Sequence, residues 1–222
     1  SSPSRGLGDV YKRQNLFCTN SICVPSRASI LTGQYSHVNG VYNLPDALDP
    51  DSLNVSKILQ KNGYQTSLIG KWHLKKEPSG FDYYKVLPGQ GLYNDPYFKT
   101  KENWKDGYQG GVREKGFSSD IIGDSSIEWL KKIDRNKPFF MMTHFKATHE
   151  PFDYPERHES LNENIVFPEP TSLYEFDSKE SGRNHLGQIV ENLTERWQND
   201  LKNEIRRYLS LIHISEPTRR TT

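Results

Sequence analysis

The sequence has few cysteines and no excess of charge of either sign. Its 222 residues include two cysteines, Cys18 and Cys23, and carry a formal net charge of +1. Two cysteines exclude a disulfide framework and a four-cysteine zinc site within the chain, although a single Cys18–Cys23 disulfide stays possible. The balanced charge gives no global reason to expect nucleic acid or an anionic membrane as a partner. Any basic site must therefore be local.

Long apolar runs are also absent. No run approaches the roughly 18 residues that would predict a transmembrane helix, so we expect no membrane span. The N-terminus lacks the basic start and apolar core of a signal peptide, and export cannot be read from this chain. With 33% hydrophobic and 26% charged residues, the composition fits one soluble domain or part of a larger one.

The two ends differ in character from the rest of the chain. Residues 1–14 and 209–222 resemble translated sequencing-adaptor reads, and we leave both out of the fold reasoning. The alternative is that they are native flexible tails, and in either case they carry no chemistry. The natural segment is then residues 15–208, cut from something longer.

The stretch from Asn20 to Gly33 predicts a short helix that begins with a cysteine. Pro25 has a backbone angle preset for a first helical turn, and Gly33 is a natural stop. Cys23 then lies at the helix N-terminus, where free backbone N–H groups and the helix dipole favour an anion and a reactive cysteine. Arg27, one turn on, adds a positive charge. The pattern is typical of a nucleophile that faces an oxyanion.

The Cys-x-Pro-Ser-Arg motif that begins at Cys23, followed by a small-residue helix ending in Thr-Gly, resembles the hallmark of the type I sulfatases. The flanking residues 17–22 are also typical of that family. The resemblance implies that a formylglycine-generating enzyme oxidises Cys23 to formylglycine, whose hydrate attacks sulfur and is stabilised by Arg27. The alternative is a buried cysteine that opens an ordinary helix.

A second candidate stretch follows a predicted strand over residues 64–69. Gly70 is expected to break this strand, and Lys71 and His73 follow directly. Ligands collect beyond the carboxyl ends of strands in open α/β sheets, so these two side chains are site candidates. The run from Gly63 to Leu74 is also similar to the second sulfatase landmark, which implies that Lys71 and His73 bind sulfate oxygens and assist the nucleophile. The alternative is an exposed lysine and a histidine packed on Trp72.

A third stretch follows residues 139–143, a continuous apolar run suited to a buried parallel strand. His144, Lys146 and His149 come next. The segment resembles the third landmark of the family, which implies that His149 binds sulfate. Lys146 and His144 are secondary candidates, since a histidine beside a strand is often a satisfied structural group.

The connecting segments predict helices and loops. We expect a helix capped by Ser52 that ends at residues 62–63, a helix from Ser118 or Ser119 to about Ile133, and a helix over residues 186–208. Residues 34–50 read as a loop in which His37 either contacts substrate or is solvated. Residues 75–116 are irregular and rich in aromatics, which either stack on a carbohydrate or pin the loop to the domain. Residues 153–183 read as a surface excursion.

Helix and strand alternate, so the sequence predicts an α/β fold. The resemblance implies an alkaline phosphatase-like fold, a mixed, mostly parallel sheet flanked by helices, with residues 15–208 a partial sulfatase catalytic domain. It implies hydrolysis of sulfate esters, and sulfated carbohydrates are the substrates that we expect. Phosphonate and phosphate monoester hydrolases of the same superfamily share the motif and remain an alternative, as does an inactive fragment. A non-catalytic relative would be expected to lose Cys23, Arg27 or Lys71, and none is lost.

The resemblance also implies one divalent cation, typically Ca²⁺, held by oxygen ligands. The family's Asp-Asp pair would precede residue 15, and its Asp with Asn or Gln would follow residue 208. Only Cys23, as formylglycine, remains as a ligand here, so we expect the fragment alone to be inactive. For the full-length family member the resemblance implies a periplasmic or secreted location.

Overall fold

The computed structural model describes residues 17–149, 151, 153–168, 198–199, 201–203 and 206. The predictions for residues 1–14 and 209–222, and most of the helix predicted over residues 186–208, lie outside this part. The two ends stay predictions. In chain order the elements are α2 (Cys23–Thr32), α3 (Ser36–Asn39), α4 (Val55–Lys61), β1 (Gln65–Lys71), β2 (Tyr83–Leu87), β3 (Tyr97–Phe98), η1 (Lys101–Asp106), β4 (Val112–Arg113), α5 (Ser118–Lys132), β5 (Phe139–His144) and η2 (Glu156–His158).

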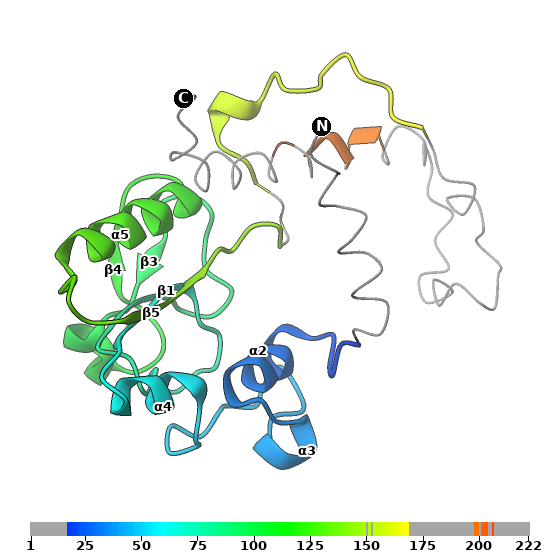
Figure 1. Ribbon diagram of the computed structural model, residues 1–222. Coiled ribbons are helices and arrows are strands. Elements are labelled where there is room, and N and C mark those ends of the chain that lie inside the picture. The colour runs from blue at the N-terminus through cyan, green and yellow to red at the C-terminus, as the bar shows by residue number, and fades with distance from the viewer. Residues whose placement is uncertain are drawn as a thin grey trace, which may run out of the picture.

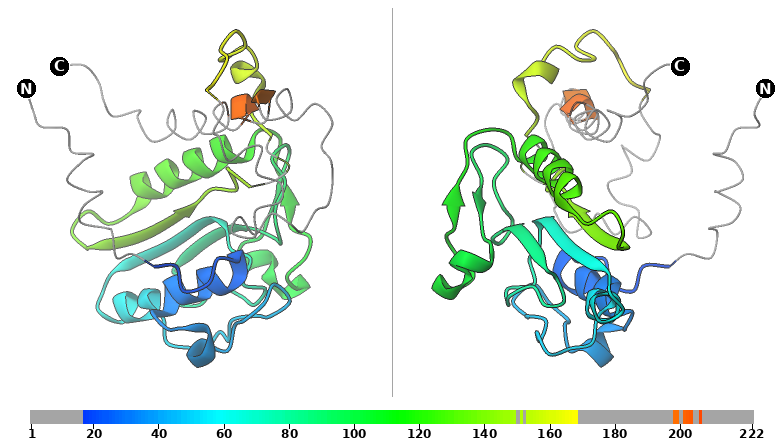
Figure 2. Two further views of the ribbon diagram at one scale, coloured as in Figure 1. Left: turned by 90° about the vertical axis from the view of Figure 1, so that its right-hand side faces the viewer. Right: turned by 60° about the vertical axis from the view of Figure 1, so that its left-hand side comes forward.

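The sheet that organises the described residues has three parallel strands in the order β2–β1–β5. Figure 1 and the left view of Figure 2 show α5 over one face of this sheet, with α2 and α4 on the other side. A separate pair, β3 and β4, is antiparallel. The predicted α/β class, a mostly parallel sheet flanked by helices, is therefore confirmed. No helix in the described segments has the length and apolar character needed to cross a membrane.

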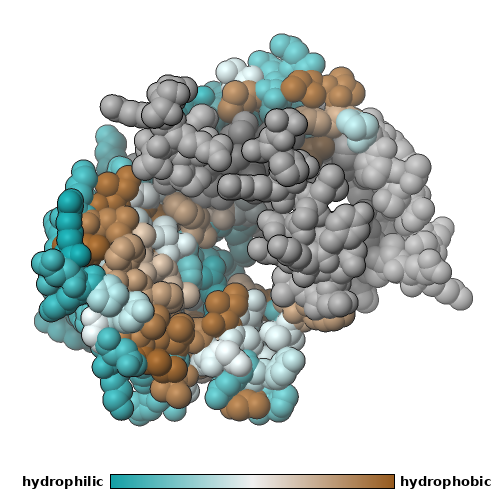
Figure 3. Space-filling model, viewed as in Figure 1, coloured by the Kyte–Doolittle hydropathy of each residue, from teal (hydrophilic) through white to brown (hydrophobic). Residues whose placement is uncertain are grey.

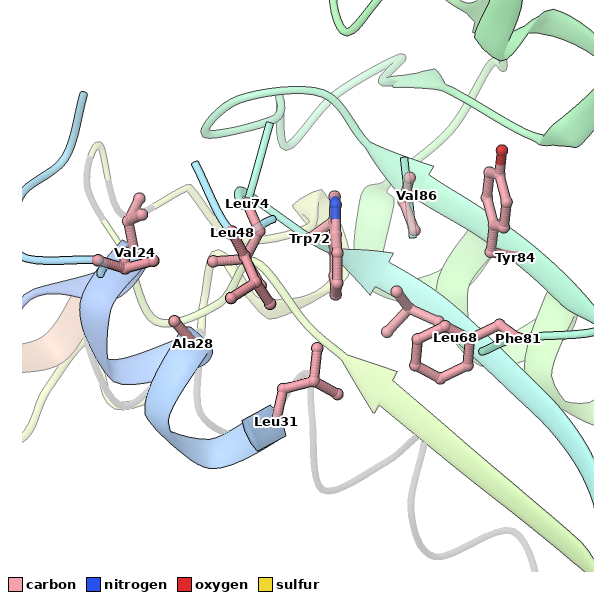
Figure 4. Packing of buried hydrophobic residues seen from close by; sticks show 11 residues of the cluster. Val24, Ala28, Leu31, Leu48, Leu68, Trp72, Leu74, Phe81, Tyr84 and Val86 are labelled. Atoms are coloured by element: carbon pink, nitrogen blue, oxygen red, sulfur yellow. The ribbon is translucent and has the colours of Figure 1, made fainter. Parts of the chain in front are cut away.

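Successive residues of β1 build the two halves of the core, because side chains alternate across a strand. Leu68 packs with Val24 and Ala28 of α2, and Ile69 packs with Ile122 of α5. Figure 4 shows the inner face of α2 turned toward Leu68 and its neighbours. Full burial of a Val, Leu or Ile side chain contributes about 1.5–3 kcal/mol. This packing fixes α2, and with it the position of its N-terminus, against the sheet.

Strand β1 does not stop at Gly70, so the prediction that this glycine breaks the strand was wrong. Gly70 pairs with Val86 of β2 and with His144 of β5, and the strand continues to Lys71. Its φ is +103°, and a Cβ built on it would lie 1.9 Å from the His144 carbonyl oxygen. The absence of a side chain is what lets β1 and β5 approach each other at this end.

Both predicted serine caps were wrong. Helix α4 begins at Val55, and Asn54 caps it by accepting a hydrogen bond from the Lys57 backbone N–H at 2.9 Å. Asn54 also donates to the Ser79 carbonyl at 3.3 Å, a tertiary bond that Ser52 does not make. Helix α5 begins at Ser118 after Phe117 without any side-chain cap. The Ser118 backbone N–H donates instead to the Tyr93 carbonyl at 2.7 Å, an acceptor from another segment of the chain.

Residues 75–116 are more ordered than the prediction of an irregular loop, since they contain β2, β3, η1 and β4. Several of their aromatic side chains are buried, and Tyr84 packs edge-to-face on Trp104 with ring centroids 5.8 Å apart. Of the two readings of these aromatics, the packing of Tyr84, Tyr93 and Phe98 fits the one in which they pin the segment to the domain.

Strand β5 is parallel to β1, as predicted, but it is not buried. Phe139 is 47% exposed and the other β5 residues are half-buried. The reason is that β5 pairs only with β1 in the described part of the chain. Hydrophobic side chains consequently gather on the face seen in Figure 3, and the α4 region adds Leu53 and Ile58, which are also exposed.

Candidate active site

Parallel strands place their carboxyl ends along one edge of the sheet, and most of the site residues predicted from the sequence lie at this edge. Strand β1 ends at Lys71 and is followed by His73, while β5 ends at His144 and is followed by Lys146 and His149. Strand β2 ends at the same edge and leads into a turn at residues 88–91. Ligands bind at such an edge in open α/β sheets, so the arrangement fits the expectation from the sequence.

Cys23 is the first residue of α2, as the sequence predicts. Ile22 is extended, the Ser26 backbone N–H donates to its carbonyl at 2.9 Å, and no side chain caps the helix. Gly33 ends the helix with φ +68°. Cys23 is half-buried, and Cys18 and Cys23 are both free thiols, which contradicts the disulfide alternative. The Cys23 side chain therefore stands at the positive end of the helix dipole.

Arg27 joins α2 to the ends of two strands. Its Nη1 donates to the Lys71 carbonyl at 2.9 Å and lies 3.1 Å from Nδ1 of His144. Burial lowers the pKa of Arg27, and the neighbouring Cys23 opposes that shift. A guanidinium stays charged even so, because its ordinary pKa is above about 12. Arg27 is thus a fixed positive charge close to Cys23.

Lys71 is a buried cation, with 2% of its surface exposed. Its ammonium donates to Oε1 of Gln90 at 2.6 Å. Burial lowers the pKa of Lys71 to about 8, repulsion from Arg27 and Lys146 adds to the shift, and Cys23 opposes it. A bound anion would reverse much of this cost, because it would supply the opposite charge that the site lacks.

His73 is a buried, neutral imidazole. It is 7% exposed, and its Nδ1 has no hydrogen-bond partner within the described residues. Burial lowers the pKa of His73 to about 4, and the positive charges of Lys71 and Arg27 act in the same direction. The ring therefore offers one N–H donor and one acceptor nitrogen near pH 7, which suits hydrogen bonding or proton transfer.

The segment after β5 brings the third stretch to the same place. Lys146 is 3% exposed, donates to the Gln90 carbonyl at 3.2 Å and lies 4.8 Å from the centre of the Tyr93 ring. The Tyr93 hydroxyl donates to the His149 carbonyl at 2.5 Å. His149 is close enough to His73 that its charge contributes to the lowered His73 pKa. Tyr93 thus anchors this segment beside Lys71 and His73.

His144 is better described as a neighbour of Arg27 than as a group that faces substrate. Its Nδ1 lies 3.0 Å from the Lys71 carbonyl as well as 3.1 Å from Arg27. Burial and, to a smaller extent, the nearby Arg27 lower the pKa of His144 to about 4, although the contact with the Lys71 carbonyl opposes the shift. A neutral His144 accepts from Arg27 when its Nδ1 is unprotonated, and donates to the Lys71 carbonyl when the proton is on Nδ1.

The structure does not bring His37 to this cluster. His37 lies in α3, beyond the end of α2 opposite to Cys23, where it is exposed and stacked on Tyr35 with ring centroids 5.8 Å apart. A role for His37 in binding substrate stays a prediction.

The cluster suits an anion better than a metal ion. Arg27, Lys71 and Lys146 are all cationic, and Asp153 is the acidic group that acts on Lys146, where it opposes the lowering of the pKa by burial. Nowhere in the described segments do three or more His, Cys, Asp and Glu residues form a group that could hold a metal ion. The described residues therefore do not fit a divalent cation, and the ligands predicted before residue 15 and after residue 208 lie outside them.

From the sequence, Gln90 was not predicted to lie at this edge, and Tyr108 stood out only as one of the aromatic residues of the segment 75–116. Gln90 contacts both lysines, and the Tyr108 hydroxyl accepts from the Gly89 backbone N–H at 2.7 Å. Burial raises the pKa of Tyr108, and the nearby Cys23 acts in the same direction. The available signal was the Pro-Gly-Gln-Gly turn directly after Tyr83–Leu87, a run that a strand prediction would have placed at the same sheet edge.

Comparison with known proteins supports this picture. The family model described as Sulfatase matches residues 11–212. The chain is 42% identical over 193 residues to the N-acetylglucosamine-6-O-sulfatase of Bacteroides thetaiotaomicron, covering 85% of this chain and 33% of that protein. It is 27% identical over 172 residues to the human N-acetylglucosamine-6-sulfatase, covering 68% of this chain and 31% of the relative.

A solved protein in complex with its substrate D-glucosamine-2-N,6-O-disulfate superposes with a TM-score of 0.69 at 29% identity, over 90% of this chain and 51% of that one. A second solved protein, in complex with k-i-k-neocarrahexaose, superposes with a TM-score of 0.60 at 19% identity, over 89% of this chain and 45% of that one, which shows the fold alone. The chain spans about a third of the length of the curated relatives it matches. The chain belongs to the sulfatase family, whose fold is alkaline phosphatase-like, and membership of this family implies a divalent metal and a formylglycine.

Proposed function

We propose that the protein containing this chain hydrolyses sulfate esters of a carbohydrate, with Cys23, converted to formylglycine, as the nucleophile. The observation that carries the proposal is that Arg27 and Lys71 lie close to Cys23 at the N-terminus of α2, with His73 beside these two charges. The named relatives are sulfatases, which are sulfuric ester hydrolases. The modifying partner would be a formylglycine-generating enzyme.

The half-buried position of Cys23 at a helix N-terminus, beside Arg27, fits a residue that is modified and then used as a nucleophile. One hydroxyl of the hydrated aldehyde attacks sulfur and displaces the carbohydrate alcohol, which takes up a proton as its bond to sulfur breaks. The second hydroxyl then loses its proton, which expels sulfate and restores the aldehyde for rehydration by water. Arg27 is fixed by the Lys71 carbonyl, so its charge is in place before substrate arrives. Such preorganised charge stabilises a transition state without reorganisation.

The two lysines and two histidines of the site would bind the sulfate group and move protons. Lys71 and Lys146 bring two buried ammonium groups toward the sulfate oxygens. His73 is neutral, so it can donate a hydrogen bond to sulfate or pass a proton to the leaving oxygen. His149, beside His73, is the second histidine of the site. The described residues do not supply the ligand set of a cation, and Ca²⁺ is the ion that we expect the full-length protein to use.

The substrate class that we favour is a glucosamine carrying a 6-O-sulfate. Its support is the 42% identity to a protein named N-acetylglucosamine-6-O-sulfatase and the likeness, at 29% identity, to a protein whose substrate is a glucosamine disulfate. Sulfated carbohydrates would then be the partners of the full-length protein.

The test is a substrate panel on the full-length protein, produced together with a formylglycine-generating enzyme. We expect hydrolysis of N-acetylglucosamine-6-sulfate and of an aryl sulfate, and much slower hydrolysis of phosphate and phosphonate monoesters. Cys23→Ala should abolish turnover, whereas Cys18→Ala, which changes the other, exposed thiol, should leave it intact. A preparation that prefers the phosphonate ester, or that stays active as Cys23→Ala, would refute the proposal.

A further inference from the structure

The turn that follows β2 lies at the edge of the sheet where the site residues gather. Gly89 and Gly91 take positive φ values of 56° and 71°, and the Gly91 N–H donates to the Pro88 carbonyl at 3.0 Å. Because β2 is parallel to β1, the turn is carried past the end of β1 at Lys71. Gln90 occupies the exposed position between the two glycines.

Gln90 is exposed, yet both of its oxygen atoms point toward buried lysines. Its side-chain Oε1 accepts from Nζ of Lys71 at 2.6 Å, and its backbone oxygen accepts from Nζ of Lys146 at 3.2 Å. Lys71 is the last residue of β1 and Lys146 follows β5, and the two ammonium groups repel each other, since Lys146 contributes to lowering the pKa of Lys71. One residue therefore holds two like charges in one place.

Two contacts fix the backbone of the turn at residues 88–91. The Gly89 N–H donates to the hydroxyl of half-buried Tyr108 at 2.7 Å, which ties the turn to a segment nineteen positions further along the chain. Gly91 packs against Leu87, because a Cβ on Gly91 would lie 2.8 Å from a methyl group of that leucine. Gln90 is thus presented to the lysines by a fixed backbone.

We propose that Gln90 is a positioning residue for sulfate binding, which sets the Lys71 and Lys146 ammonium groups so that both address one anion. This inference rests on the proposed function. An amide oxygen orients an ammonium while leaving its net charge available to substrate. A carboxylate at this position would pair with Lys71 and repel a sulfate ester. An ammonium has three donors, so Lys71 keeps two beyond the bond to Gln90.

A purely structural role for Gln90 predicts something different. Loss of a structural link would lower the melting temperature and the amount of active protein, and the affinity for sulfate in the folded fraction would not change. Loss of a positioning contact weakens the affinity for sulfate and raises the KM, because the Lys71 ammonium is no longer oriented toward the anion. Inorganic sulfate, the product, reports this affinity without any need for turnover.

The experiment uses the full-length protein with the variants Gln90→Ala and Gln90→Glu, and with Gln109→Ala as the control. Gln109 is also exposed, lies in the same region and makes no hydrogen bond within the described residues. The measurements are the sulfate affinity by calorimetry, kcat and KM for an aryl sulfate, and thermal melting. We expect Gln90→Ala to weaken sulfate binding and to lower kcat/KM about 10-fold, in the range for a hydrogen bond to a charged group. Gln90→Glu should lower both further, and Gln109→Ala neither.

A double-mutant cycle then assigns the effect to Lys71. In the Lys71→Ala background, Gln90→Ala should change kcat/KM by less than about 3-fold, since the contact is already lost. The proposal is overturned if both Gln90 variants match Gln109→Ala, or if they melt earlier with unchanged sulfate affinity. A wild-type protein that fails to hydrolyse any sulfate ester refutes the proposed function instead, and the sulfate affinities of the variants still decide the role of Gln90.

Discussion

Gly70 offers the sharpest test of how the fold builds the site, because it joins β1 to β5 at the edge where the site residues lie. The change is Gly70→Ala, which adds one methyl group. A Cβ at this position would lie 1.9 Å from the His144 carbonyl oxygen and 3.2 Å from Cδ1 of Ile122. The backbone φ of +103° also disfavours any residue with a side chain. Strands β1 and β5 would have to separate, and His144 and Arg27 would move with them.

The magnitude follows from these two costs. A side chain in a sparsely populated backbone region costs on the order of 1–3 kcal/mol. The clash adds to this, because the atom in the way is backbone and cannot rotate aside. We expect Gly70→Ala to lower the free energy of unfolding by about 3 kcal/mol or more, a large share of the roughly 5–15 kcal/mol typical of a domain. Gly40→Ala is the matched control, since its φ is +75° with nothing within 4 Å of the added Cβ.

The assay is denaturant unfolding of the full-length protein, together with aryl sulfatase activity at a temperature where both variants are folded. Gly40→Ala should lose about 1 kcal/mol and keep its activity. Gly70→Ala should lose several times more and lose most of its activity. If Gly70→Ala were as stable and as active as Gly40→Ala, the close approach of β1 and β5 would not be what aligns the site.

Three further predictions concern the site and the chain. In the full-length protein, Lys71→Ala, His73→Ala and His149→Ala should each lower the turnover of an aryl sulfate by about two or more orders of magnitude without loss of folding, and near-normal rates in any of them would refute that residue's role. The kcat/KM should fall as the pH rises through about 8, because burial lowers the pKa of Lys71 to that value and the ammonium loses its charge above it; a flat profile through that pH would contradict the role of its charge. Residues 1–222 expressed alone should aggregate or fold only in part, because β5 and α4 leave hydrophobic groups exposed, and should not hydrolyse an aryl sulfate even with Ca²⁺; a monomeric, active preparation would contradict this.

The elements predicted best were those whose signals are local. The proline and glycine around the Cys23 helix fix its two ends, and the apolar run at residues 139–143 identifies β5. The strand-end rule then placed Lys71 and the histidine after β5 at one edge, since it depends only on strand direction. These parts of the fold and of the site could therefore be read from the sequence.

The features that sequence reasoning missed depend on contacts between distant segments. Gly70 reads as a strand breaker until its neighbour on β5 is known, and Asn54 caps α4 partly because Ser79 lies beside it. Strand β2 was hidden in an aromatic segment, because Tyr83 to Leu87 alternates only partly and its partner β1 lies earlier in the chain. Because β2 was not recognised as a strand parallel to β1, the sequence could not predict that Gln90 lies beside Lys71.

The charge states of the site residues also could not be predicted from the sequence. A lysine after a strand gives no hint that it is almost fully buried beside an arginine and a second lysine. A histidine in the same place gives no hint that these charges keep it neutral. Burial and neighbours from three separate stretches set these properties, and the sequence separates the stretches by more than forty positions.

The central claim is that Cys23 becomes the nucleophile of a sulfatase. Its most direct test is peptide mass spectrometry on the full-length protein, made together with a formylglycine-generating enzyme and shown to hydrolyse a sulfate ester. The account predicts that the peptide containing residue 23 carries the mass of formylglycine and that Cys18 stays a cysteine, with activity in proportion to the modified fraction. An active preparation in which Cys23 is wholly unmodified would contradict it.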